Sequence, residues 1–248
     1  MVVRDWLRAG FPSAGVGCAV SRERLALLDV QSGGSGPFDA SSLTEDYELG
    51  LKIAETGGAT KFVRVRGEDG RLIATRAFFP RTLETAVRQK TRWVCGIALQ
   101  GWDRMGWSGR PLDGWMRLRD RRGPLSALVL FVAYVLVFLT GGLAIAHQLG
   151  LARAPVVTPA TKALLIANAA SLGWRAACRA LFTAREYGPR EGMRAVLRIP
   201  LSNIIAIMAA RRAVAQYVFS LLGGTLRWDK TEPVSYTHLR AHETRHDL

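Results

Sequence analysis

The longest uninterrupted apolar stretch of the chain predicts a membrane-spanning helix. Residues 125–146, LSALVLFVAYVLVFLTGGLAIA, contain no charged side chain. About 22 residues at helical rise cross a hydrocarbon core of roughly 30 Å. A buried soluble helix rarely stays uncharged on every face for so long. We therefore expect a transmembrane helix here.

A second and less uniform apolar run covers residues 155–174, PVVTPATKALLIANAASLGW. Lys162, Asn168 and two prolines interrupt it. Its length still suits a membrane crossing, so we expect a second span at about these positions.

A third apolar run, IPLSNIIAIMAA, covers residues 199–210 and stops at Arg211 and Arg212. This run is too short to cross a bilayer, which predicts an interfacial or partly inserted helix. A third span that continues to about residue 220 is the alternative. Either way, the membrane region is expected to occupy residues 125–233.

Charge is distributed unevenly around these runs and predicts their orientation. Lys and Arg number 34 against 20 Asp and Glu, a formal net charge of +14. The segments before the first span and after the second are rich in arginine, whereas the connector 147–161 carries only Arg153. Because cytoplasmic loops carry the excess of Lys and Arg, both flanks are predicted inside and the connector outside. His147, at the boundary of the first span, is expected to be an interface residue.

Residues 1–101 have the mixed pattern of an α/β domain. In KFVRVRG, residues 61–67, apolar and basic side chains alternate as in a strand. Residues 82–102 have helical spacing, while SGGSGPF, residues 32–38, predicts a loop whose glycines are only a weak indication of phosphate binding. The fold class predicted is α/β plus membrane α, with a basic interfacial segment at residues 102–124 joining the two parts.

Two adjacent acids, Glu45 and Asp46, begin one predicted helix and allow two interpretations. Ser42 and Glu45 have the S-x-x-E spacing of a capping box, and acids are favoured in a first helical turn. The second interpretation is catalytic, because a capping box from Ser42 uses Glu45 and leaves Asp46 without a capping role.

A second polar cluster follows in the helix predicted at residues 82–102. Gln89 shares a helical face with Arg92 or with Trp93. An amide, a guanidinium and an indole suit a sugar phosphate, because polar groups bind hydroxyls or phosphates and the indole offers an apolar plate. An amphipathic helix anchored at a membrane by basic and Trp side chains is the alternative.

Cysteine and histidine positions indicate neither a disulfide framework nor a metal site in this chain. Cys18, Cys95 and Cys178 are far apart, and we expect buried, reduced thiols. Three of the four histidines lie in VSYTHLRAHETRHDL, residues 234–248, at a four-residue spacing that could suggest metal ligands. This tail resembles a translated sequencing adapter, so we expect it to be non-native.

The order of the two polar motifs resembles the inverting glycosyltransferases of family two, the group of cellulose and hyaluronan synthases. These enzymes carry a T-E-D motif and a Q-x-x-R-W motif in a cytosolic GT-A domain that precedes membrane helices. FDASSLTEDYELGLKIAE, VRQKTRWVCGIALQGWDRMGW and LRWDKTE are more narrowly similar to inner-membrane glycosyltransferases related to phage adsorption protein B.

The resemblance implies a role for each matching position. Asp46 would be the general base, Glu45 would support it, and Thr44 completes the first motif. The second motif would line the acceptor and donor-phosphate side through Gln89, Arg92 and Trp93. GVGCAVSRERL resembles the family's segment beneath the donor sugar, with Gly17 and Cys18 nearest to it.

This chain departs from the family pattern in its first part. Only 43 residues precede Thr44, so the nucleotide-binding acids and the D-x-D motif that holds a divalent cation, Mg²⁺ or Mn²⁺, are absent. We therefore expect a fragment, truncated at both ends and inactive by itself, that represents the C-terminal part of a GT-A domain followed by membrane helices.

The function expected of the intact parent is sugar transfer from a nucleotide-sugar donor to a glycan acceptor for polysaccharide synthesis. It would be a multi-pass protein of the bacterial inner membrane, in contact with lipid, with its catalytic part in the cytoplasm. The rival is a non-catalytic membrane assembly or phage-receptor component. No nucleic-acid partner is expected, because the positive-inside rule already explains the basic clusters.

Overall fold

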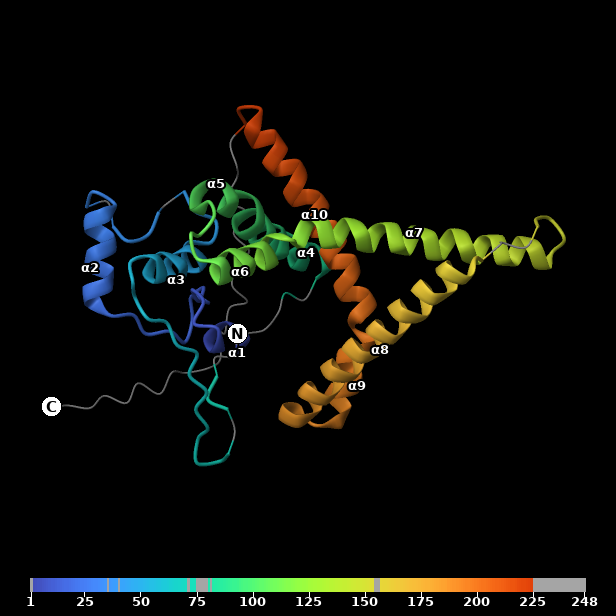
Figure 1. Ribbon diagram of the computed structural model, residues 1–248, viewed down its shortest axis with the longest axis horizontal. Coiled ribbons are helices and arrows are strands. Elements are labelled where there is room, and N and C mark those ends of the chain that lie inside the picture. The colour runs from blue at the N-terminus through green and yellow to red at the C-terminus, as the bar shows by residue number, and fades with distance from the viewer. Residues whose placement is uncertain are drawn as a thin grey trace.

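The described part of the chain is built from helices and loops. A computed structural model describes residues 2–224, except residues 35, 40, 71, 75–79, 81 and 154–156. The first part contains α1 (Val2–Trp6), α2 (Arg22–Gln31), α3 (Glu45–Glu55), α4 (Leu83–Val94), the π-helix η1 (Cys95–Gln100), α5 (Gly101–Met105) and α6 (Pro111–Arg121). Four helices follow: α7 (Gly123–Gln148), α8 (Pro159–Tyr187), α9 (Pro189–Leu197) and α10 (Ile199–Leu221) (Figure 1). The adapter-like tail and three connector positions lie outside the described residues.

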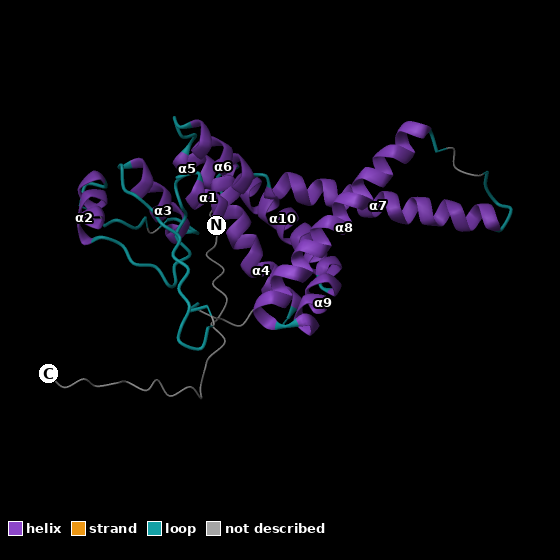
Figure 2. Cartoon of the chain, turned by 60° about the horizontal axis from the view of Figure 1, so that its bottom comes forward, coloured by secondary structure: helices purple, strands orange, loops and turns teal. Residues whose placement is uncertain are grey.

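The predicted strand at residues 61–67 is wrong. These residues are drawn as loop (Figure 2), and in the described part of the chain an isolated bridge between Arg66 and Leu72 is the sole β pairing. Alternation predicts a local extended conformation, but a strand exists only where a second strand accepts its hydrogen bonds. The α/β fold class is therefore not confirmed by the described residues.

Two of the described helices, α7 and α10, are long and apolar enough to cross a membrane, with 26 and 23 residues. None of the most apolar window of α7 is buried inside the protein. α10 continues as one helix through Arg211 and Arg212, so it has the length that the longer alternative for the third run requires. α8 begins at Pro159 and contains most of the second predicted span, but it does not share this composition, and that span stays a prediction.

Helix α10 packs against α4, η1 and α7, and thereby joins the last apolar helix to the first part of the chain (Figure 1). Small side chains allow the close approach, because Ala209 and Ala213 are fully buried. The Thr91 hydroxyl of α4 donates to the Ala209 carbonyl at 3.4 Å. Cys95 is buried with Leu43 and Ala213 in one cluster, and burial raises the pKa of its thiol to about 11.

Helix α6 is fastened to the end of α5 by two buried arginines. The Arg117 guanidinium donates to the Met105 carbonyl at 2.7 Å, and Arg121 donates to the carbonyls of Gly101 and Gly106, both at 2.7 Å. The carbonyls of Met105 and Gly106, at the end of α5, have no further helical turn to pair with, so the arginines satisfy them. The placement of residues 102–124 at a membrane interface stays a prediction.

Candidate functional site

Helix α3 begins at Glu45, directly after Thr44, and its start is not a capping box. Thr44 occupies the N-cap position without a side-chain cap hydrogen bond. The Ser42 hydroxyl donates instead to Glu48 Oε1 at 2.7 Å. The interpretation in which Ser42 and Glu45 cap each other is therefore wrong, because Ser42 lies two residues before the N-cap position and its hydroxyl pairs with Glu48.

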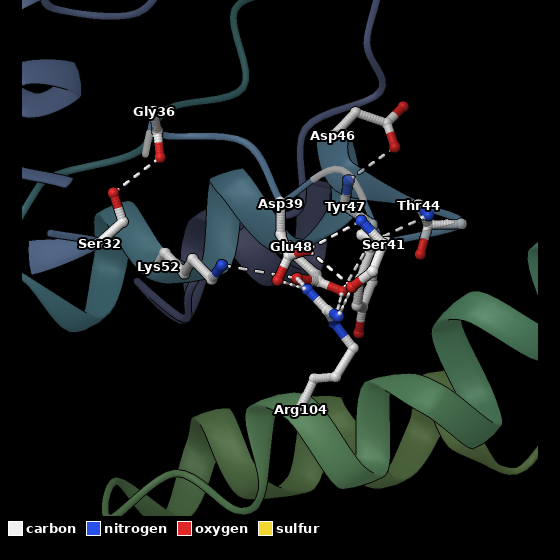
Figure 3. A network of polar contacts seen from close by, with 11 residues as sticks. Ser32, Gly36, Asp39, Ser41, Thr44, Asp46, Tyr47, Glu48, Lys52 and Arg104 are labelled. Atoms are coloured by element: carbon white, nitrogen blue, oxygen red, sulfur yellow. Dashed lines mark hydrogen bonds and ion pairs between the residues drawn. The ribbon is translucent and has the colours of Figure 1, made fainter. Parts of the chain in front are cut away.

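Glu48 is the buried centre of a polar network at this turn (Figure 3). Its side chain is 3% exposed, and Arg104 of α5 donates to Oε1 through Nε at 2.8 Å. Arg104 also donates to the Ser41 hydroxyl at 2.8 Å and contacts the Asp39 carboxylate. Lys52, one turn along α3, lies 3.6 Å from Glu48 Oε2. One guanidinium thus ties α5 to the loop before α3 and to α3 itself.

Protonation in this network follows from its contacts. Burial alone would lower the pKa of Arg104, but hydrogen bonds and charge from Glu48 and Asp39 raise it overall. Hydrogen bonds from Ser41, followed by Arg104, hold the pKa of the Asp39 carboxyl well below its usual range. Because the folded pKa of Asp39 is depressed, this contact stabilises the fold above the unfolded pKa. That contribution is lost as the pH falls through the folded pKa.

Asp46, by contrast, points away from this network (Figure 3). It is half-buried, and its Oδ1 accepts the Tyr47 backbone N–H at 2.8 Å. Among the described residues no cation pairs with it, and the same holds for Glu45. The first turn of α3 therefore separates its acids, with Glu48 neutralised inside and Asp46 unpaired at the edge.

The loop at residues 13–18 lies against Asp46. A Cβ built on Gly15 would be 2.6 Å from Asp46 Oδ2, so only glycine fits this contact, and the φ of +72° at Gly15 also favours glycine. The Ser13 hydroxyl accepts the Gly15 N–H at 3.3 Å and donates to the Cys18 sulfur at 3.4 Å. The loop that was expected near the sugar thus touches the candidate base through Gly15, while Gly17 and Cys18 are exposed.

The second motif lies on α4. It precedes, by one to two helical turns, the point where Gly96 of η1 contacts Thr44. A Cβ on Gly96 would be 2.6 Å from Thr44 Oγ1, so the absence of a side chain lets η1 touch the start of α3. Arg92 precedes Gly96 by four residues and Gln89 precedes it by seven. This spacing places the three residues along one side of the continuous helix formed by α4 and η1. In the described part of the chain, no hydrogen bond or ion pair joins the two motifs directly.

Several polar atoms of α4, and one of Thr44 at the start of α3, are buried without a partner. Gln89 Oε1 and Arg92 Nε accept and donate no hydrogen bond, and Thr44 Oγ1 is in the same condition. A buried polar group without a partner costs free energy, so such atoms mark positions where a ligand or water can bind. Trp93 leaves 41% of its surface exposed. Lys90, which follows Gln89 in the sequence, is partly buried, and this burial lowers the pKa of its amine.

The far side of α3 is held by a hydrogen bond from Tyr47 to an ion pair between Arg4 and Asp120. The Tyr47 hydroxyl donates to Asp120 Oδ2 of α6 at 2.8 Å, and Arg4 of α1 donates to the same oxygen at 2.7 Å. Burial and the neighbouring Asp120 raise the pKa of Tyr47, so its hydroxyl remains a donor. α3 is therefore fixed from both sides, by α5 and by α6.

Comparison with protein-family models identifies the family of this chain. Residues 1–146, more than half of the chain, match the family described as glycosyl transferase family group 2. The chain belongs to this glycosyltransferase family. The resemblance inferred from the T-E-D and Q-x-x-R-W motifs is thereby confirmed.

Two curated relatives extend the comparison beyond the family match. The chain is 32% identical over 256 residues to bacteriophage adsorption protein B of Escherichia coli strain K12, and equally to bacteriophage N4 adsorption protein B of Escherichia coli O157:H7. Each alignment covers 92% of this chain and 33% of the relative, so the chain spans about a third of their length. No solved structure matches the chain.

The described residues of this glycosyltransferase do not fit a metal site of their own. Among them, no group of three or more His, Cys, Asp or Glu side chains could hold a metal ion.

The sequence interpretation missed three contributors to the site of this glycosyltransferase: Gly15, Glu48 and Arg104. Glu48 could have been recognised, because apolar residues on several sides of α3, from Tyr47 to Ile53, leave little exposed surface for an acid between them. A buried carboxylate needs a cationic or hydrogen-bonding partner, but nothing in the local pattern identifies Arg104, 56 residues later, as that partner.

Replacing Arg104 with methionine should destabilise the fold, because the Glu48 carboxylate would stay buried without its main partner. Removing one member of a buried ion pair costs about 3 kcal/mol. The free energy of unfolding in detergent, followed by Trp fluorescence, measures the effect.

The matched control for this test is Arg110→Met, which removes an arginine whose pair with Asp113 is 62% exposed on the arginine side. That change should cost about 1 kcal/mol or less. Equal losses from the two variants would show that the Glu48 network carries no special share of stability.

Proposed function

We propose that this chain is part of a membrane glycosyltransferase that moves a sugar from a nucleotide-sugar donor to a glycan acceptor with inversion. Family membership carries the reaction class. The single structural observation behind the assignment of roles is the contrast between Glu48, which is buried and fully paired, and Asp46, which is half-buried and unpaired. An acid that removes a proton must be free of a permanent cation and reachable by substrate.

Asp46 takes the proton from the acceptor hydroxyl, and that oxygen then attacks the anomeric carbon of the donor sugar as the nucleoside diphosphate leaves. Glu45 adds negative potential beside the base. Arg92, whose Nε lacks a partner, stabilises the charge on the leaving diphosphate, and Gln89 binds hydroxyls. The exposed Trp93 offers its ring to a pyranose face. In the whole protein a divalent cation, Mg²⁺ or Mn²⁺, would supply further charge for the diphosphate.

We assign the catalytic part to the cytoplasmic side of the bacterial inner membrane, where it contributes to polysaccharide synthesis. The arginine-rich flanks of the apolar helices support this orientation, with the connector 147–161 in the periplasm. The names of the curated relatives favour a second candidate, a component of phage adsorption. That function would need the protein at the membrane but no catalytic base.

Asp46→Asn in the full-length gene product should lower sugar transfer about 10²–10⁴-fold, because the amide cannot accept the proton. Transfer from labelled nucleotide-sugars is measured in membranes with equal amounts of each variant. Glu68→Gln is the matched control, since Glu68 is an exposed acid in the loop between α3 and α4, outside the segments assigned to the site. Near-normal transfer by Asp46→Asn, with phage adsorption intact or lost, would refute the catalytic assignment.

Gly15→Ala should reduce turnover about 10²-fold, because the new Cβ would displace the Asp46 carboxylate by about 1 Å. Gly15 is a positioning residue, so we expect kcat to fall while KM for the donor stays within about threefold. Gly34→Ala is the control, because Gly34 has a similar φ of +79° but nothing within 4 Å of its Cβ position. Equal losses in both variants would mean that backbone strain, not the contact with Asp46, is responsible.

Leu151→Cys should react with a membrane-impermeant maleimide in intact spheroplasts, because the connector is assigned to the periplasm and Leu151 is 78% exposed. The native Cys18, exposed in the site loop, is the internal control and should react only after lysis. Labelling of Cys18 before lysis, or protection of position 151 until lysis, would reverse the orientation.

A further inference from the structure

Helix α9 packs on α8 through one narrow face. A Cβ on Gly192 would be 2.7 Å from the Ala180 carbonyl oxygen and 2.9 Å from Ala184 Cβ, so the two helices are in backbone contact there. Ala195, three residues later on the same side, is 8% exposed. Gly192 and Ala195, the smallest residues of α9 with Ala195 the only alanine, are its two buried residues.

The opposite face of α9 carries large apolar and cationic side chains together. Met193 is 62% exposed and Leu197 is 71% exposed. Arg190, Arg194 and Arg198 follow one another at four-residue spacing, which aligns them in a stripe beside the two apolar residues. All three arginines are exposed.

Internal pairing leaves most of this charge available. Glu191 is the acid within α9, and both Arg194 and Arg198 contact it, the latter at 3.9 Å. Both pairs are more than 60% exposed on the arginine side, where an ion pair contributes little. Three arginines against one glutamate give residues 190–198, which include the C-cap Arg198, a net charge of +2.

The position of α9 limits what can cover this face. Arg198 alone separates α9 from α10, one of the two described helices that can cross a membrane. Figure 1 shows α9 beside the C-terminal half of α8, at the start of α10. The face therefore lies at the end of a long apolar helix, where a membrane boundary is expected.

We propose that this face of α9, formed by Arg190, Met193, Arg194, Leu197 and Arg198, binds a bilayer surface that contains anionic phospholipids. The two apolar side chains enter the boundary between headgroups and acyl chains, while the arginines bind headgroup phosphates. The long aliphatic stems of the arginines favour this arrangement, since they cover apolar surface and keep the charge among the headgroups. The proposal does not depend on sugar transfer.

Charge favours lipid over a second copy of the chain. Two such faces would place six arginines against each other, and the whole chain has a formal net charge of +14. Like charges at an interface oppose association, whereas an anionic surface gains about fivefold in affinity for each arginine that it binds.

The test places a nitroxide label on Leu197→Cys in the full chain, with Cys18 and Cys178 replaced by serine, in nanodiscs of phosphatidylcholine with increasing phosphatidylglycerol. We expect a two-component spectrum in which the lipid-buried component grows with phosphatidylglycerol content and shrinks at high salt. Arg190→Gln with Arg194→Gln should lower the ratio of buried to exposed label about 25-fold, roughly fivefold per arginine.

Arg22→Gln with Lys61→Gln is the matched control, because it removes the same charge from exposed positions of the first part of the chain and should change the ratio less than twofold. The proposal would be overturned if the ratio of buried to exposed label were the same in pure phosphatidylcholine as in discs with phosphatidylglycerol. It would also be overturned if the arginine variant had the same ratio as the unchanged protein. Spin–spin broadening between labels in nanodiscs that hold two chains would overturn it in favour of a second copy.

Discussion

The burial of one carboxylate, that of Glu48, organises the first part of this protein. A buried carboxylate is tolerated only with partners that replace its lost hydration, and Arg104 supplies the main one. Because the same guanidinium also holds Ser41 and Asp39, the loop before α3 cannot move independently of α5. The neutralisation of Glu48 thus fixes the turn that carries Asp46.

Close backbone approach complements this charge pairing. Gly96 brings η1 against Thr44, and Gly15 brings the preceding loop against Asp46, so the three segments of the candidate site meet where side chains are missing. The polar atoms left without partners, on Gln89 and Arg92, lie along the continuous helix formed by α4 and η1. The geometry thus combines the paired support around Glu48 with buried polar atoms that have no partner within the protein.

Local patterns predicted much of the helical structure, and partners in space explain what they missed. The uncharged run became α7, and the helices expected around Asp46 and Gln89 exist as α3 and α4. The strand at residues 61–67 failed because its alternation says nothing about a neighbouring strand. The capping box of Ser42 failed because Glu48 competes for its hydroxyl, and the support from Arg104 could not be foreseen from spacing at all. The roles of the motif residues remain predictions, carried by resemblance and by their free polar atoms.

The cluster of Leu43, Cys95 and Ala213 has a consequence for the order in which this protein is made. Its members come from the loop before α3, from η1 and from α10, and α7 and α8 lie between the last two along the chain. During synthesis, Ala213 therefore becomes available to pack beside the T-E-D turn only after both of these helices have left the ribosome. The packing around this turn is therefore completed only after α10 has been made, so a nascent chain that ends before Ala213 lacks part of the support of the turn.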